Sequence, residues 1–118
     1  MRPIPPKLRN EMEIDPYYQR CCVTGKSRSQ MVKIEWHHNL IYAGRQVNEK
    51  WCILPLWDKI HDQARNKEVK EILDWIMLNR ATDGDLARYS KADLIAKKER
   101  LNKDSKLWMK KMKSMGTF

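Results

Sequence analysis

The chain has 118 residues, of which 42% are hydrophobic and 33% are charged, and its mean hydropathy is −0.78. This length suits one domain with a compact core and is too short for two independent domains. The chain has no apolar run of about 18 residues, and its beginning lacks the apolar segment of a secretory signal. These features exclude a membrane-spanning class, and we expect a cytoplasmic protein that forms a single domain over residues 1–118.

The formal net charge is +9 at pH 7, and the isoelectric point is about 9.6. In a single domain, such a basic balance is typical of proteins that bind nucleic acid. A basic surface that only aids solubility, or one that contacts an anionic membrane, is the alternative interpretation. The three cysteines, Cys21, Cys22 and Cys52, are odd in number and two are adjacent, which favours reduced thiols over a disulfide framework.

Residues 1–19 contain four of the five prolines, and we expect an extended, irregular arm there. A strand follows over 31–36, because Val32, Ile34 and Trp36 alternate with polar residues. Two adjacent histidines stand at the C-terminal end of this strand.

Residues 39–50 predict a loop with Gly44 as its bend. The apolar run 51–56 predicts a second strand. Because Pro55 has no N–H to donate, it places that strand at an edge of the sheet or near the strand's own end.

A helix is predicted from Asp58, which is suited to the N-cap, to about Asn79. Its buried stripe consists of apolar residues at helical spacing: Val69, Ile72, Leu73 and Ile76. The polar stretch 81–85 breaks this helix, and Ser90 with Asp93 forms a capping arrangement that opens a last helix. In that helix, apolar residues recur at a spacing of seven: Leu94, Leu101, Trp108 and Met115.

The segment from Lys97 to Lys113 contains eight Lys and Arg residues against two acidic residues. This basic helix has three interpretations: contact with the DNA backbone, packing against a partner helix, and a solvated outer face. With the end of the preceding helix, it forms a helical extension over residues 68–118.

All three histidines lie around the two predicted strands and the helix that follows them. His37 and His38 end the first strand, and His61 lies in the first turn of the helix. If that helix packs across the strands, the strand end and the helix start converge. Imidazole both binds divalent metal ions and takes up a proton near neutral pH. Imidazoles confined to one region of a strongly basic chain predict chemistry on a phosphate backbone.

Several local patterns in residues 20–67 occur together. They are Glu-x-His-His over 35–38, a loop that contains Gly44, a short apolar strand, and Lys-Ile-His-Asp over 59–62. In this combination the segment resembles the HNH endonuclease family, and the loop His-His-Asn-Leu-Ile-Tyr-Ala-Gly is similar to phage and prophage versions. The resemblance implies an α+β fold in which a small β-hairpin is crossed by a helix, the ββα-metal motif. The irregular arm precedes this motif and the C-terminal helices follow it.

The resemblance implies that His37 and His61 hold a divalent metal ion and that His38 is the general base that activates water. The open site expected from two imidazoles suits Mg²⁺ or Mn²⁺, and imidazole ligands also permit Zn²⁺ or Ni²⁺. Separate roles for adjacent histidines make physical sense, because a metal-bound imidazole has no lone pair left to act as a base. Glu35 shares a strand face with His37, and we expect its carboxylate to orient that ligand.

The middle asparagine of the family motif, which holds the base histidine, has two candidates. Asn48 fits by residue type, whereas the usual family spacing, counted back from His61, places Cys52 there. Many relatives also carry two Cys-x-x-Cys pairs that bind zinc. Here Trp57 and Ile60 occupy the second pair, so we expect no zinc knuckle.

Four basic residues are candidates for nucleic-acid contacts, with solvated side chains as the alternative interpretation: Arg45, Lys26, Arg28 and Arg65. The leading hypothesis is a metal-dependent HNH endonuclease that hydrolyses DNA phosphodiester bonds and has no membrane partner. The alternative is a non-catalytic nucleic-acid-binding module that retains the fold. A monomer with one such site nicks one strand, so double-strand cleavage requires a homodimer or sequential cuts. A phage or restriction assembly is a further candidate partner.

Overall fold

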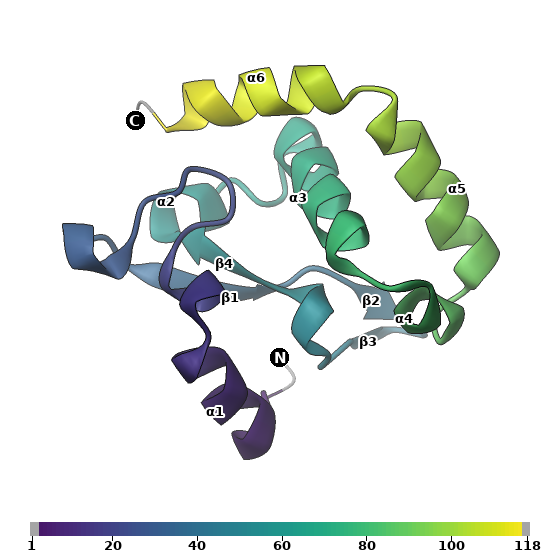
Figure 1. Ribbon diagram of the computed structural model, residues 1–118, viewed down its shortest axis with the longest axis horizontal. Coiled ribbons are helices and arrows are strands. Elements are labelled where there is room, and N and C mark those ends of the chain that lie inside the picture. Colours follow the sequence, from purple (N-terminus) through teal and green to yellow (C-terminus); the bar gives the residue numbers. More distant parts are fainter. Residues whose placement is uncertain (1–2, 117–118) are drawn as a thin grey trace.

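The computed structural model describes residues 3–116, which form an α+β fold (Figure 1). The α-helices in this range are α1 (Pro6–Ile14), α2 (Asp58–His61), α3 (Lys67–Arg80), α4 (Asp83–Ala87), α5 (Lys91–Asn102) and α6 (Ser105–Met115), and short 3₁₀ helices span Pro16–Gln19, Arg28–Gln30 and Lys50–Cys52. The strands are β1 (Ile34–His38), β2 (Ile41–Tyr42), β3 (Arg45–Gln46) and β4 (Ile53–Trp57). They make two antiparallel pairs, β1 with β4 and β2 with β3.

The β1–β4 pair runs through the middle of the molecule, with α1 on one side and α3 on the other (Figure 1). All of β4 is buried, and His38 lies opposite Ile53 in the register. β1 begins later than the predicted 31–36, because a short 3₁₀ turn ends at Met31 with a left-handed backbone (φ 62°). β1 also ends later than predicted, at His38, so both adjacent histidines lie within the strand.

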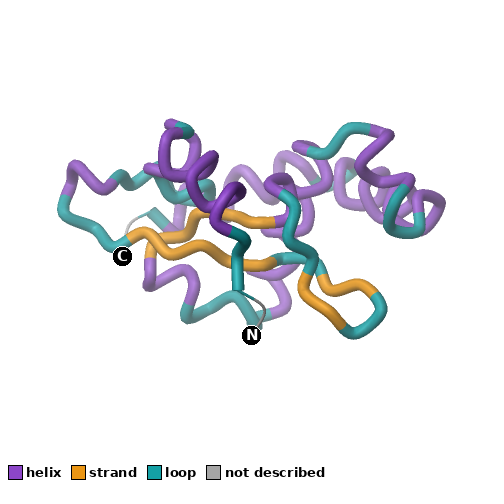
Figure 2. The backbone as a smooth tube through the Cα atoms, turned by 90° about the horizontal axis from the view of Figure 1, so that it is seen from below, coloured by secondary structure: helices purple, strands orange, loops and turns teal. Residues whose placement is uncertain are grey.

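The predicted loop 39–50 contains the β2–β3 hairpin, which projects from the body of the molecule (Figure 2). Ala43 and Gly44 form its two-residue turn, both with positive φ (51° and 77°). Two positive φ values in succession are typical of the type I′ hairpin turn, which favours glycine. The prediction of Gly44 as the bend is confirmed.

The single helix predicted from 58 to 79 is wrong: the structure has α2 and α3 there, separated by residues 62–66. Asn66 accounts for the new start, because its side chain accepts hydrogen bonds from the backbone of Glu68 (3.0 Å) and Val69 (3.5 Å) and so caps α3. Asp58 is the first residue of α2 rather than its N-cap. The break leaves His61 at the end of a short helix against β1.

The irregular arm predicted for 1–19 is also wrong in the described residues, because α1 is helical from Pro6. Pro5 and Pro6 occupy the N-cap and the first helical position, where a missing N–H costs nothing. α1 packs its fully buried Met12 against Tyr18 and Ile53.

Two helices, α5 and α6, replace the single last helix expected from the spacing of seven. Leu101 and Trp108 nevertheless both reach the core, and the Trp108 Nε1–H donates to the Leu101 carbonyl oxygen (2.9 Å). Ser90 precedes α5 with a left-handed backbone and makes no side-chain cap. The stretch 81–85 breaks α3 as expected, yet it starts α4 through a capping box of Thr82 and Asp85. Across residues 3–116, no helix has the length and apolar character needed to cross a membrane.

Candidate active site

The structure brings His37 of β1 and His61 of α2 together, with their ring centroids 5.1 Å apart. The β1–β4 pair fixes the first ring and the short α2, which packs on both strands, fixes the second. Both rings and that of His38 line one cavity of about 350 Å³. The predicted convergence of the strand end and the helix start is therefore present.

Glu35 contacts His61 rather than His37, which corrects the predicted pairing. The His61 Nδ1 lies 3.0 Å from the Glu35 Oε1, and this hydrogen bond is the main cause that lowers the pKa of the Glu35 carboxyl. Glu35 and His37 share a strand face, and α2 places His61 on that same face. With Nδ1 donating to the carboxylate, the His61 Nε2 keeps its lone pair for a metal ion.

Burial is the main cause that lowers the pKa of His37 to about 4, and the electrostatic effects of His61 and Lys70 act in the same direction. The ring is therefore uncharged at neutral pH. An uncharged imidazole has a lone pair for a metal ion, whereas a protonated one has none.

Asn48, not Cys52, contacts the candidate base. The His38 Nε2 lies 2.6 Å from the Asn48 Oδ1, and the Asn48 Nδ2 donates to the Pro3 carbonyl oxygen (3.0 Å). Because Oδ1 can only accept, His38 donates from Nε2 and keeps its Nδ1 lone pair. Cys52 is fully buried in the main core.

The predicted phosphate-contacting residues divide into two groups. Arg65 lines the cavity with the three histidines, and Arg45 lines a separate hollow beside Asn48. The Lys26 ammonium instead lies 5.0 Å from the centroid of the Trp57 ring, and the Arg28 guanidinium donates to the Gln19 side chain (3.3 Å). Neither is among the residues that line the two cavities at the histidines.

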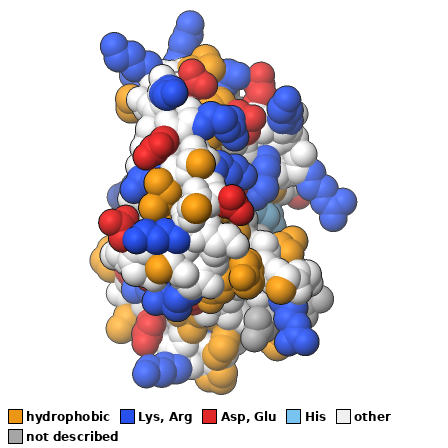
Figure 3. Space-filling view, turned by 90° about the vertical axis from the view of Figure 1, so that its right-hand side faces the viewer, with side chains coloured by type: hydrophobic (Ala, Val, Ile, Leu, Met, Phe, Trp, Pro, Cys, Tyr) orange, Lys and Arg blue, Asp and Glu red, His pale blue; other side chains and the backbone are white. Residues whose placement is uncertain are grey.

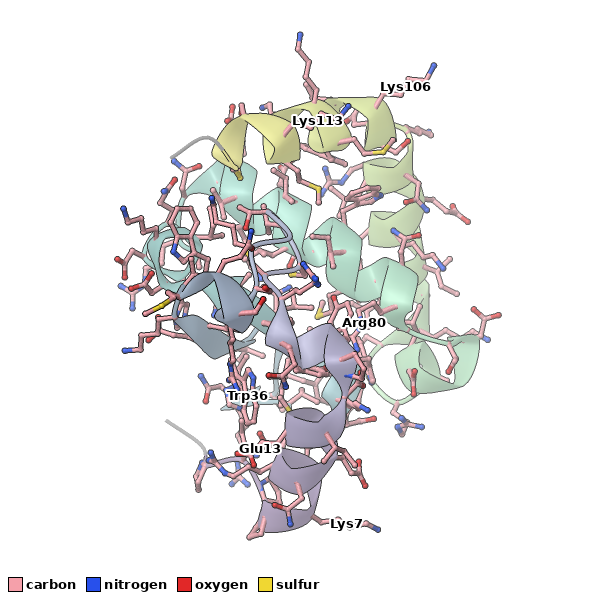
Figure 4. All side chains as sticks on the ribbon, turned by 60° about the vertical axis from the view of Figure 1, so that its left-hand side comes forward. Lys7, Glu13, Trp36, Arg80, Lys106 and Lys113 are labelled. Atoms are coloured by element: carbon pink, nitrogen blue, oxygen red, sulfur yellow. The ribbon has the colours of Figure 1, made fainter. Side chains whose placement is uncertain are left out.

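Sequence reasoning missed Arg9, which also lines the histidine cavity. Its guanidinium carbon lies 5.8 Å from the centroid of the Trp36 ring, and Figure 4 shows Trp36 beside α1. No pattern in the sequence placed Arg9 at the site, because residues 1–19 were predicted to be irregular. The helix α1 is what brings Arg9 close to β1.

A buried charged cluster around Asp74 was missed as well. The Asp74 carboxylate accepts from Lys70 (2.7 Å), Lys97 (2.7 Å) and the Asn39 side chain (3.0 Å). The signal in the sequence is an acidic residue, Asp74, between the buried apolar residues Leu73 and Met77 of α3. Its partner Lys97 lies on α5, so the ion pair could not be found from the sequence of α3 alone.

The imidazoles of His37 and His61 are suited to hold a divalent ion, and the Glu35 carboxylate orients the His61 ring through its Nδ1. Residues 3–116 contain no group of three or more His, Cys, Asp and Glu side chains that could hold a metal ion. Any ion held there would take its remaining ligands from water or from a bound ligand. Comparisons with family models, with curated proteins and with solved structures find no match for this chain.

Proposed function

We propose that the protein is a metal-dependent endonuclease of the HNH type, with a ββα-metal core, that hydrolyses DNA phosphodiester bonds. The observation that carries the proposal is the division of the three histidines. The rings of His37 and His61 lie edge to face with their centroids 5.1 Å apart, while the His38 Nε2 lies 2.6 Å from the Asn48 Oδ1. The net charge of +9 supports an anionic polymer as substrate.

In this proposal the chain's own residues position the ion and move the proton. His37 and His61 would hold a divalent ion, which would supply charge neutralisation during phosphodiester hydrolysis. The His38 Nδ1 takes a proton from the attacking water, while the His38 Nε2–H remains hydrogen-bonded to the Asn48 Oδ1. The water oxygen bonds to phosphorus as the bond to the leaving oxygen breaks, and that oxygen takes a proton from solvent. Arg65 and Arg9, which line the cavity, offer positive charge to the other phosphate oxygens.

Nicking of a supercoiled plasmid tests the proposal, with Mg²⁺, Mn²⁺, Zn²⁺ and Ni²⁺ assayed separately. We expect His38→Ala to reduce the nicking rate by about 10²–10⁴-fold, because a positioned general base contributes that much. Asn10→Ala, an exposed change on α1, is the control and is expected to nick like the parent protein. Absence of nicking by the parent with every metal, or equal nicking by His38→Ala, contradicts the enzyme and leaves a nucleic-acid-binding module.

A further inference from the structure

A second and larger cavity adjoins the histidines, and of its lining residues the proposed hydrolysis uses only ones that it shares with the first cavity. Its volume is about 530 Å³, within the range of small-molecule sites. It lies between the segment after β1, α3 and α5, and it shares four lining residues with the first cavity: His37, His38, Ala64 and Arg65. The two cavities therefore meet at the histidine pair.

The walls of this cavity differ in chemistry. One wall is apolar and consists of Leu40, Ile41, Met77, Leu78 and Leu94. The other carries the ammonium groups of Lys70 and Lys97, with Arg65 at the junction between the cavities. Figure 3, which views the α5 side, shows a histidine in a recess beside Lys and Arg side chains. A ligand complementary to both walls has an apolar face and an anionic part.

The buried Asp74 fixes the position of the two lysines. Its side chain is 4% exposed, and each carboxylate oxygen accepts from one ammonium group, so helices α3 and α5 hold their cations at set positions. Lys70 directs its three N–H donors at Asp74 and at two oxygens of Asn39. In residues 3–116, Lys97 has Asp74 as its one ion-pair partner and keeps two donors for a ligand.

We propose that this cavity receives one unstacked nucleotide of the DNA strand, next to the scissile phosphate. Its base lies against the apolar wall, and its phosphate contacts Lys97 and Arg65. The inference rests on the proposed function and narrows the substrate to DNA that is single-stranded or has an unpaired nucleotide at the cut. Extracting a base from an intact duplex costs stacking and pairing energy, whereas an unpaired base avoids most of that cost.

Binding measured without metal separates this pocket from catalysis. The protein is His38→Ala in EDTA, and the probes are a short single-stranded oligonucleotide with a central 2-aminopurine and the same sequence in a full duplex. We expect the single strand to bind at least about tenfold more tightly than the duplex. We also expect its 2-aminopurine fluorescence to rise on binding, because the base leaves its stacked neighbours.

Two matched pairs of variants locate the effect. Leu94→Trp fills the cavity, and Leu107→Trp makes the same change on exposed α6. Lys97→Met and Lys98→Met remove the same charge from adjacent positions. We expect Leu94→Trp and Lys97→Met to lower single-strand affinity about tenfold relative to their controls, with duplex affinity unchanged and folding checked by thermal melting.

Equal single-strand affinity for Leu94→Trp and Leu107→Trp, or unchanged 2-aminopurine fluorescence in the His38→Ala background, overturns the pocket even if the parent protein nicks plasmid DNA. The opposite outcome is also distinguishable. If the parent protein nicks DNA with none of the metals, the endonuclease proposal fails, but a lower single-strand affinity of Leu94→Trp than of Leu107→Trp still supports the pocket. If Lys97→Met does not fold because Asp74 loses a partner, the Leu94 pair decides alone.

Discussion

Asn48 connects two parts of the chain that are far apart in sequence. Its Oδ1 accepts from His38, and its Nδ2 donates to the backbone of Pro3. The two contacts fix the orientation of the amide, because only one of its ends can accept a hydrogen bond. For the middle position of the family motif, the spacing from His61 favoured Cys52, whereas the structure has Asn48 in contact with His38. The β2–β3 hairpin explains this, because it brings residue 48 back to the end of β1.

We predict that Asn48→Ala lowers the plasmid-nicking rate by about 10–100-fold, because His38 loses the contact that fixes its orientation and tautomer. Asn79→Ala, an exposed change on α3, is the matched control. Cys52→Ala is expected to lower the melting temperature, because it removes a fully buried side chain, yet to preserve nicking below that temperature. A Cys52→Ala protein that is folded but inactive contradicts the assignment of Asn48.

His37 makes stability depend on pH in a defined direction. The folded protein keeps this ring neutral down to a pKa of about 4, whereas in the unfolded chain the ring takes a proton near its ordinary value of 6.5. Between these values the unfolded state binds more protons, so stability falls as the pH is lowered from about 6.5 to about 4. We predict that His37→Gln flattens the dependence of melting temperature on pH in this window, measured in EDTA. A parallel curve for the two proteins contradicts the prediction.

At the scale of elements, α1 shows why the proline content of residues 1–19 led to a wrong prediction of irregular structure. Prolines disfavour a helix interior, but Pro5 and Pro6 lie at the start of α1, where they are tolerated. The helix is then stabilised by tertiary contacts of Met12 with Tyr18 and Ile53, which no local pattern reveals.

We predict that Met12→Ala lowers the free energy of unfolding by about 2–5 kcal/mol, because it leaves a cavity at a fully buried position. Urea denaturation measures the change. Glu11→Ala, the exposed neighbour on the same helix, is expected to change the value by less than about 0.5 kcal/mol. Similar effects for the two variants indicate that α1 is not docked on the strands in solution.

The parts of the fold that the sequence predicted are those fixed by local chemistry. The turn at Gly44 and the buried positions Ile72 and Leu73 follow from backbone preference and helical spacing. The partner of Glu35 and the cluster around Asp74 do not, because each depends on how distant elements pack. The convergence of the histidines was predictable only through the resemblance and the expected order of strands and helix.

At the scale of the whole molecule, the positive charge is concentrated over the C-terminal helices. Figure 4 shows Lys106 and Lys113 extending from α6 away from the body of the protein. This placement is compatible with contact to the DNA backbone or with solvation alone, and the two interpretations differ in their dependence on salt.

We predict that the double change Lys106→Gln and Lys113→Gln makes the plot of log affinity against log salt concentration shallower by about 0.9 per lysine that contacts a phosphate. Fluorescence anisotropy with labelled DNA measures the slope. Lys7→Gln with Lys91→Gln removes the same charge from α1 and the start of α5 and is the control. Equal slopes for the two double variants indicate that the exposed face of α6 is only solvated.

The contact between Asn48 and the Pro3 carbonyl has a practical consequence for protein production. Any affinity tag fused before Pro3 adds chain next to the side chain that holds His38. The end of α6 lies on the opposite side of the β1–β4 pair from α1 (Figure 1). A tag placed after α6 is therefore the safer choice, and a weakly active N-terminally tagged preparation should be cleaved by a protease before its activity is judged.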